Sequence, residues 1–349
     1  MKRAIRVLVV DDSALMRQML SRFLSEAGME VVGTARDGVE GLALALQLKP
    51  DVITLDVEMP RLDGLGMLRR LMEIEPMRVV MVSSLTQRAA PATVEALALG
   101  ALDVVAKPSG GISLDLHRVR DELIDKVKIA AAARVPRPAA PERAPAEGAA
   151  VPCGERSRPA VADGIVIIGS STGGPSALTA IFARLPKDFP LPIVVVQHMP
   201  PGFTASLANR LDGLSALTVS EAAPERIPKA GEALVAPGGV HTVFGPAGAI
   251  RLDTSPPHLG VRPSVDVTVE SAVARWGRGV RLVVLTGMGM DGAKGARLVK
   301  QAGGRVIAQD EATSVVYGMP RAVVEMGLAD RVCSLGDIPE ALVAIAARE

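Results

Sequence analysis

The chain has 349 residues, 48% of them hydrophobic, and its 39 lysines and arginines nearly balance its 38 aspartates and glutamates. This near-neutral charge gives no basis for non-specific nucleic-acid binding, which depends on clustered basic side chains. No apolar run approaches the roughly 20 residues that a membrane-spanning helix needs, so we expect neither nucleic-acid binding nor membrane insertion.

A stretch rich in Pro, Ala, Arg and Glu divides the chain. Residues 129–160 contain almost no bulky apolar side chains, so they cannot bury enough surface to offset the entropy lost on ordering. We predict a flexible linker there, between a first domain at 1–128 and a second at 161–349. The two cysteines, Cys153 and Cys333, have neither metal-site nor disulfide spacing, which favours a cytoplasmic protein.

The first domain alternates strand and helix signals. Continuous short apolar runs predict strands buried on both faces of a sheet at Ile5–Val10, Val52–Leu55, Val79–Val82 and Val104–Ala106. Apolar residues recur at helical spacing over 15–24, and Gly28 can end that helix. Asp37 and Glu40 form a capping-box pattern before another helix. Such a βα repeat predicts a parallel sheet with helices on both faces.

Polar side chains follow the carboxyl ends of these predicted strands. They are Asp11, Asp12, Asp56, Ser83 and Lys107. Sites in open α/β sheets form beyond those ends, so these side chains should meet in one pocket. Two carboxylates about 4 Å apart repel by about 4 kcal/mol at an effective dielectric constant of 20, so three need a cation, and oxygen ligands favour Mg²⁺. Each aspartate alone would more readily be a solvated strand end or a helix cap, but the whole set in this order favours a phosphoryl site on Asp56.

The same residues lie in segments that resemble the response-regulator receiver family across residues 4–126. The segments are VVDDSALMR, TLDVEMPRLDGLGML, VVMVSSLT and VVAKPSG. The resemblance implies a flavodoxin-like fold in which Asp56 accepts a phosphoryl group from a chemotaxis histidine kinase. Ser83 and Lys107 would then sense the phosphate, and Val104 stands where the family usually has an aromatic residue. The implied Mg²⁺ ligands are Asp11, Asp12, Asp56 and the backbone carbonyl of Glu58.

The second domain repeats the alternation of strands and helices. Strands are predicted at Ile165–Gly169, Ile193–Gln197, Leu282–Thr286 and Arg305–Ala308. Helices are predicted at Ser176–Leu185, Thr204–Leu211 and Ala293–Ala302. Residues 231–253 are typical of short strands and turns. We therefore predict a mainly parallel sheet with a small antiparallel addition.

The segment IVIIGSSTGGPSAL predicts a strand, a tight glycine-bearing turn and the start of a helix. Such a turn can present the Ser171 hydroxyl beside backbone N–H groups, which an acyl-transfer site requires. A phosphate loop or a plain tight turn remains equally open from the local sequence. The fingerprint G-x-G-x-x-G and the Walker Lys-Ser/Thr ending are both absent, however.

Four histidines could supply a base: His117, His198, His241 and His258. Position favours His198 over a capping role, because it ends the strand IVVVQH at a carboxyl end. Asp291 follows another predicted strand among glycines and could orient that base. Its alternative role is to cap the next helix, which is a common task for aspartate.

These residues lie in segments that resemble the catalytic domain of the protein-glutamate methylesterases of bacterial chemotaxis, the CheB family. The segments, in order over residues 165–325, are IGSSTGGPSAL, VVVQHMPPGFTASLANRL, VAPGGVHTVF, RPSVDVTVESAV, VVLTGMGMDGAKG and DEATSVVYGMPRAV. The resemblance implies a Rossmann-like fold with Ser171 as nucleophile, His198 as base and Asp291 as its orienting acid. The backbone N–H groups of Thr172 and Met288 would form the oxyanion hole.

The resemblance also implies a function. The chain would hydrolyse glutamate γ-methyl esters on methyl-accepting chemoreceptors and deamidate glutamine, with no cofactor in the esterase domain. The tandem arrangement of the two domains suggests control by phosphorylation, and a monomer is our default expectation. A DNA-binding regulator would need a basic helix-turn-helix output domain, and a dehydrogenase would need the missing fingerprint. A non-catalytic scaffold or phosphate sink of the same fold is the remaining alternative.

Overall fold

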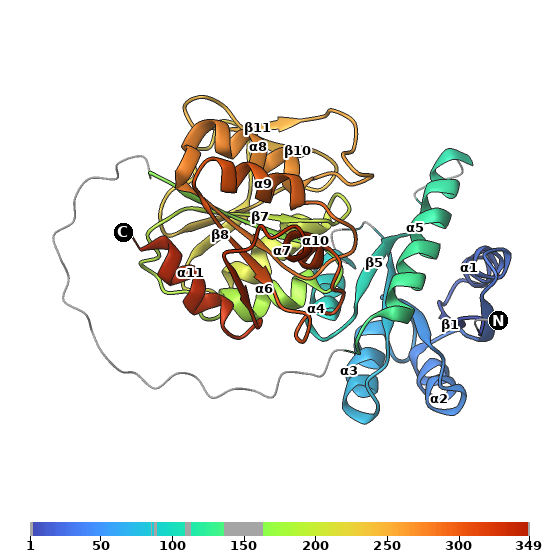
Figure 1. Ribbon diagram of the computed structural model, residues 1–349. Coiled ribbons are helices and arrows are strands. Elements are labelled where there is room, and N and C mark those ends of the chain that lie inside the picture. Colours follow the sequence, from blue (N-terminus) through green and yellow to red (C-terminus); the bar gives the residue numbers. More distant parts are fainter. Residues whose placement is uncertain (1–2, 85, 87–88, 109–112, 136–162, 348–349) are drawn as a thin grey trace.

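The computed structural model describes residues 3–84, 86, 89–108, 113–135 and 163–347. These residues form two α/β domains, each with a parallel sheet between two layers of helices, as Figure 1 shows. The predicted fold class of two doubly wound domains is thereby confirmed. Most of the predicted linker, residues 136–160, lies outside the described residues, as does Cys153. Within the described part of the chain, no helix is both long and apolar enough to cross a membrane.

The first domain has a five-stranded sheet in the order β2-β1-β3-β4-β5, the flavodoxin-like order. Its strands are β1 (Arg6–Val10), β2 (Glu30–Ala35), β3 (Val52–Asp56), β4 (Val79–Ser83) and β5 (Asp103–Ala106). Its helices are α1 (Ala14–Glu26), α2 (Gly38–Leu48), α3 (Gly64–Ile74), α4 (Ala89–Ala98) and α5 (Ser113–Ala132). Helices α1 and α5 cover one face, and α2, α3 and α4 cover the other.

The local signals explain most of these elements. Every residue of β3 and β4 is buried, as their continuous apolar runs indicated. The Asp37 carboxylate accepts hydrogen bonds from the N–H groups of Val39 and Glu40, so it caps α2 as predicted. Strand β2 was not predicted, because it is a partly exposed edge strand in which glycine and threonine interrupt the apolar run.

Helix α5 continues to Ala132, four residues beyond the predicted domain boundary at residue 128. The predicted linker start at 129 is therefore wrong. Ala130 and Ala133 are almost completely buried in the cluster that α1 and α5 form with the sheet. An alanine-rich run looks like a linker by composition, but here its small side chains allow the helix to pack closely.

The second domain has a seven-stranded parallel sheet in the order β14-β13-β12-β6-β7-β9-β8. Its strands are β6 (Ile165–Ser170), β7 (Ile193–Gln197), β8 (Thr218–Glu221), β9 (Glu232–Val235), β12 (Val280–Val284), β13 (Arg305–Gln309) and β14 (Arg331–Cys333). Its helices are α6 (Gly174–Phe182), α7 (Phe203–Asp212), α8 (Val265–Trp276), α9 (Ala293–Gln301), α10 (Met319–Glu325) and α11 (Ile338–Ala346), with a short 3₁₀ turn at Gly277–Gly279. Helices α6, α7 and α11 cover one face, and α8, α9 and α10 cover the other.

The predicted antiparallel addition is a separate two-stranded ribbon of β10 (His241–Phe244) and β11 (Ile250–Asp253). It packs on α8, where Phe244 meets Trp276 edge-to-face at 4.9 Å between ring centroids. Strand β9, from the same predicted region, joins the main sheet in parallel orientation.

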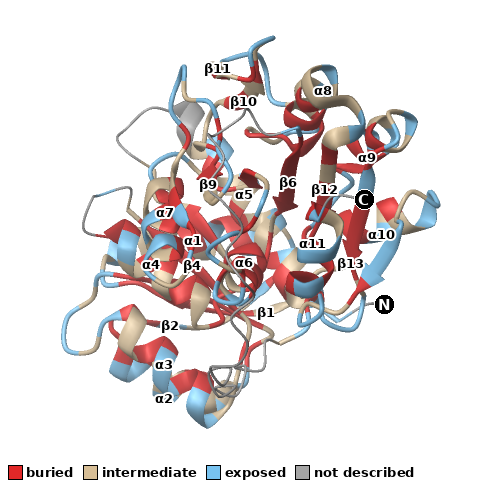
Figure 2. Ribbon diagram, turned by 90° about the vertical axis from the view of Figure 1, so that its left-hand side faces the viewer, coloured by how far each residue is buried: buried red, intermediate tan, exposed pale blue. Residues whose placement is uncertain are grey.

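One apolar cluster runs through both domains. Helix α4 of the first domain packs on α6 and α7 of the second, as Figure 1 shows. Buried side chains of α4, such as Val94 and Leu97, belong to the same cluster as Leu178 of α6 and Leu207 of α7. Figure 2 shows buried residues, in red, on α4, α6 and α7. The two domains therefore share part of their core.

Gly64 provides a test of how tightly the first domain is packed at its polar strand ends. A Cβ atom on Gly64 would lie 1.9 Å from the backbone carbonyl oxygen of Asp56, whereas one on Gly66 would meet mainly the flexible end of Leu62. We expect Gly64→Ala to lower the free energy of unfolding by about 3 kcal/mol, because backbone must move. Gly66→Ala, in the same helical turn, should change it by no more than about 1 kcal/mol. Urea denaturation of both variants measures this, and equal effects would contradict it.

Candidate active site

The three candidate catalytic residues follow three adjacent strands. Ser171 follows β6, His198 follows β7, and Asp291 lies in the loop after β12. Strand β6 is the point from which the chain builds the sheet in both directions, and ligands of open α/β sheets bind at such switch points. The structure thus brings together three side chains that are up to 120 positions apart in the sequence.

His198 and Asp291 form a close, nearly buried pair. His198 Nε2 lies 2.8 Å from Asp291 Oδ2, and the two side chains are 9% and 3% exposed. Burial by itself would raise the pKa of the Asp291 carboxyl. The hydrogen bond and charge of His198, with the N–H groups of Asp266 and Val265, outweigh that effect and hold this pKa below its usual range. Asp291 is thus an ionised acceptor that fixes the orientation of the imidazole.

Asp291 does not cap the helix that follows it, which was its alternative role. The N-cap of α9 is Gly292, which has no side chain to offer. The Asp291 carboxylate instead accepts hydrogen bonds from the N-terminus of α8. The donors are Ser264 Oγ at 2.8 Å, Val265 N at 2.7 Å and Asp266 N at 3.0 Å. A helix N-terminus stabilises a negative charge, so α8 supports the ionised form.

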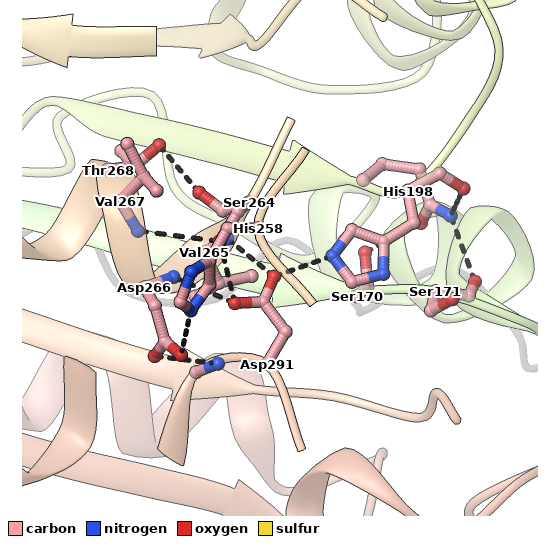
Figure 3. A network of polar contacts seen from close by, with 12 residues as sticks. Ser170, Ser171, His198, His258, Ser264, Val265, Asp266, Val267, Thr268 and Asp291 are labelled. Carbon is pink, nitrogen blue, oxygen red and sulfur yellow. Dashed lines mark hydrogen bonds and ion pairs between the residues drawn. The ribbon is translucent and has the colours of Figure 1, made fainter. Parts of the chain in front are cut away.

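Ser171 lies on a tight turn between β6 and α6. Its N–H donates to the Thr286 carbonyl at 3.0 Å, and Gly287 allows that neighbouring loop to approach, because a Cβ there would lie 2.7 Å from Ser171 Cβ. Figure 3 shows the His198 ring between Asp291 and the turn that carries Ser171. Since Nε2 contacts Asp291, Nδ1 is the ring nitrogen available to the serine. Among the described residues, no hydrogen bond joins the two side chains in this state.

Two backbone N–H groups beside Ser171 are available as donors. Neither Thr172 N nor Met288 N has a hydrogen-bond partner among the residues that the structure describes. Thr172 is buried, whereas the Met288 residue is 53% exposed. Unpaired N–H groups next to a nucleophile are what an oxyanion hole requires.

Gln197 is a buried residue of this site that sequence reasoning missed. Its amide nitrogen donates to the carbonyl oxygens of Ser171 at 2.9 Å and His198 at 3.0 Å, and its Oε1 accepts from Ser170 Oγ at 2.6 Å. The glutamine therefore ties the backbone of the nucleophile to that of the base. Ser170, whose hydroxyl makes this bond, is completely buried. A polar residue at the end of the apolar run IVVV was the one available signal.

The other histidines have different roles. His241 is completely buried, accepts from Ser264 N at its Nδ1 and contacts the Pro256 carbonyl through Nε2, so it is a structural residue. His117 is exposed on α5. His258 pairs with Asp266, a second buried carboxylate behind the site that sequence reasoning also missed.

The predicted polar cluster of the first domain is also assembled. Carboxylate oxygens of Asp11, Asp12 and Asp56 lie within 4.8 Å of one another, and Lys107 Nζ lies 2.8 Å from both Asp11 and Asp56. Three carboxylates with one ammonium group leave a net negative charge, and all the possible metal ligands are oxygen atoms. This set fits Mg²⁺.

Two further predicted residues lie near that cluster. Ser83 is completely buried at the end of β4, and its Oγ lies 2.8 Å from the Thr93 hydroxyl of α4. The Glu58 side chain accepts a hydrogen bond from Ser84 Oγ at 3.3 Å. Val104, which stands where the receiver family usually has an aromatic residue, is buried between the sheet and its neighbouring helices. Thr93 thus connects Ser83 to the helix that packs on the second domain.

Comparisons with known proteins cover both domains. Residues 166–342 match the family described as CheB methylesterase, and residues 7–116 match the response regulator receiver domain. A protein-glutamate methylesterase/protein-glutamine glutaminase of Symbiobacterium thermophilum is 55% identical over 98% of this chain and 97% of its own. The protein of that name from Thermotoga maritima is 48% identical over 98% of each chain. The crystal structure of the Thermotoga maritima CheB methylesterase catalytic domain is 51% identical and has a TM-score of 0.51, over 52% of this chain and 97% of that one.

The Asp56 carboxyl should make the stability of the metal-free protein depend on pH. Burial raises its pKa from 3.8 to about 6, Lys107 opposes the rise and Asp11 adds to it. A raised carboxyl pKa favours the folded state at low pH, and that contribution is lost as pH rises through about 6. We therefore expect Asp56→Asn to be more stable than the wild type by about 2 kcal/mol at pH 7. The difference should fade towards pH 4, and denaturation in the presence of a chelator measures it. A difference that does not vary with pH would contradict this explanation.

Proposed function

This chain belongs to the CheB methylesterase family, with a receiver domain before the catalytic domain, and we propose that it removes γ-methyl esters from glutamate side chains of chemoreceptors. Deamidation of receptor glutamines is the second proposed activity, as the name of the relatives suggests. The observation that carries the proposal is the His198–Asp291 pair beside Ser171. We place the reaction in the cytoplasm, carried out by a monomer.

In the proposed reaction, Ser171 attacks the ester carbonyl. Asp291 holds the proton on Nε2 of His198, so Nδ1 takes the proton of the serine hydroxyl. The N–H groups of Thr172 and Met288 stabilise the oxyanion of the tetrahedral intermediate. The imidazolium then protonates the leaving methoxide, and methanol departs. Water, activated by the same imidazole, hydrolyses the acyl-enzyme to a glutamate carboxylate. No cofactor has a role in these steps.

The same route can deamidate glutamine. The acyl-enzyme is identical, but the leaving group is ammonia, which leaves less readily than methanol. We therefore propose that ester hydrolysis is the faster of the two reactions in this chain.

For the receiver domain, we propose that Asp56 accepts a phosphoryl group from a chemotaxis histidine kinase. Mg²⁺ would be held by Asp11, Asp12, Asp56 and the Glu58 carbonyl, and would offset negative charge on the phosphoryl oxygens. Lys107, which already contacts Asp56, would move with the phosphate, and Ser83 would donate to it. The all-oxygen cluster around Asp56 supports this assignment.

The receiver contacts the turn that carries Ser171, which suggests how phosphorylation controls the esterase. The Thr172 hydroxyl donates to Asp103 of β5 at 2.5 Å, and Gly173 N donates to the Leu102 carbonyl at 3.0 Å. Asp103 is itself held by Lys126 of α5 at 3.0 Å. These contacts restrain the residues immediately after the nucleophile.

A second contact lies beside the proposed oxyanion hole. Arg134, just after α5, donates to the carbonyls of Glu311 and Ala312 at 2.8 and 2.7 Å, and its N–H donates to Val315. A cavity of about 430 Å³ separates α5 from the loop residues near Met288. We propose that the unphosphorylated receiver restricts access to Ser171 from this side and that phosphorylation loosens both contacts.

Methanol release from methylated chemoreceptor membranes tests the enzymatic proposal. The wild type should release methanol, and an acyl-phosphate donor with Mg²⁺ should raise the rate. Ser171→Ala should reduce the rate by at least about a thousandfold, because it removes the nucleophile. Ser170→Ala, one position away, should retain most of the activity, since within the described part of the chain its hydroxyl bonds to Gln197 alone. Absence of methanol from the wild type with several receptors would leave a non-catalytic scaffold or phosphate sink as the function.

The restraint by the receiver can be tested with Arg134→Ala. Loss of its side-chain hydrogen bonds should raise the rate of methanol release without a phosphate donor by about five- to tenfold, at the lower end of usual coupling energies. Asp121→Ala, on the exposed side of α5, is the matched control and should behave as the wild type. An unchanged basal rate in Arg134→Ala, with a normal response to the donor, would show that this contact does not restrain the enzyme.

A further inference from the structure

A second carboxylate lies directly behind the triad. Asp266, in the first turn of α8, is 2% exposed, and its carboxylate lies within 4.8 Å of that of Asp291. Two buried acids at this distance repel each other strongly unless other groups offset their charge. Figure 3 shows Asp266 and His258 on the side of Asp291 that faces away from Ser171.

Each of the two acids accepts hydrogen bonds from the start of the helix next to the other acid. Asp291 accepts from the N-terminus of α8, as described above. Asp266 in turn accepts at its Oδ1 from Gly292 N at 2.9 Å and Gly295 N at 2.6 Å, the start of α9. The loop that carries Asp291 is therefore fastened by Asp266. A substitution of Asp266 therefore affects Asp291 in two ways. It alters the hydrogen bonds that hold this loop, and it alters the negative charge beside the Asp291 carboxylate.

His258 is the partner of the second oxygen of Asp266. Its Nε2 lies 3.4 Å from Asp266 Oδ2, and the side chain is 35% exposed. A tight turn, in which the backbones of His258 and Val261 exchange hydrogen bonds, holds the residue in place. The ring can thus exchange protons with solvent while the carboxylate it faces remains buried.

The groups around Asp266 act on the pKa of its carboxyl in opposite directions. Burial raises the pKa of its carboxyl, the negative charge of Asp291 adds to the rise, and the N–H groups of Gly295 and Gly292 and the charge of His258 oppose it. On α9, the pKa of Lys294 is raised mainly by its hydrogen bond to Glu270, with a contribution from Asp266. Imidazole is the type of side chain that ordinarily changes its charge near neutral pH, and His258 supplies the imidazole that faces Asp266.

We propose that Asp266 and His258 form a second acid–imidazole pair that tunes the proton affinity of the catalytic histidine. Asp266 is a positioning residue that acts through Asp291, and protonation of His258 cancels part of its charge. This inference rests on the proposed function, because His198 must be the base for the tuning to affect catalysis. With the Asp266 charge present, His198 holds its proton more strongly. With His258 protonated, it holds that proton less strongly.

Variants of the two residues should move the pH–rate profile in opposite directions. Asp266→Asn can still accept from Gly292 and Gly295 but lacks the charge, so the acidic limb of kcat/KM should move to lower pH by about half a unit or more. His258→Gln cannot become positive, so the limb should move to higher pH. Glu270→Gln removes an exposed carboxylate from the same helix and should leave the profile unchanged.

Titration of the histidine rings separates this inference from the proposed function. The chain has only four histidines, so ¹³C-labelled imidazoles can be assigned in the full-length protein with one substitution for each. The pH at which the His198 ring titrates should shift as the acidic limb does, whether or not a receptor substrate is present. An unshifted His198 titration in Asp266→Asn would overturn the proposal, even if the variant were less stable. An unshifted titration in His258→Gln would remove His258 from the pair.

Discussion

The contact between the Asp291 carboxylate and the N-terminus of α8 is the interaction on which the rest of the candidate catalytic site depends. A buried negative charge needs compensation, and the helix N-terminus, Ser264 and His198 together supply it. Because the α8 N-terminus holds Asp291 in place, the hydrogen bond to Asp291 orients the His198 imidazole. That orientation leaves the other ring nitrogen to the turn of Ser171. The position of one helix thus determines the geometry of a site built on three strands.

Much of the fold was readable from hydrophobic runs. Strand Ile193–Gln197 was predicted to the residue, because its continuous apolar run begins directly after Pro192 and ends at a polar residue, Gln197. Edge strands such as Glu30–Ala35 and Thr218–Glu221 were missed, because one side of each is exposed and the run is broken. The helix Val265–Trp276 was not predicted either. Its valines alternate with polar residues in a pattern closer to a strand, and only the tertiary contacts of its N-terminus show why it is a helix.

The residues of the candidate site also divide into those that could be predicted from the sequence and those that could not. Ser171, His198 and Asp291 could be proposed because each follows a predicted strand, and parallel strands end at one edge of a sheet. Gln197 and Asp266 could not, because their importance comes from hydrogen bonds to backbone groups that lie far away in sequence. A glutamine at a strand end and an aspartate early in a helix are ordinary in composition. Such supporting residues become visible only when the distances are known.

The shared apolar cluster between α4 and the helices α6 and α7 bears on how this architecture can evolve. A receiver joined to its output only through a linker could be exchanged for another by recombination. Here the receiver supplies part of the core of the enzyme and two hydrogen-bond acceptors to the turn of Ser171. A foreign receiver would leave apolar side chains of α6 and α7 in water and would fail to hold that turn. The two halves of this chain are therefore expected to be inherited as one unit, with substitutions on one side of the boundary matched on the other.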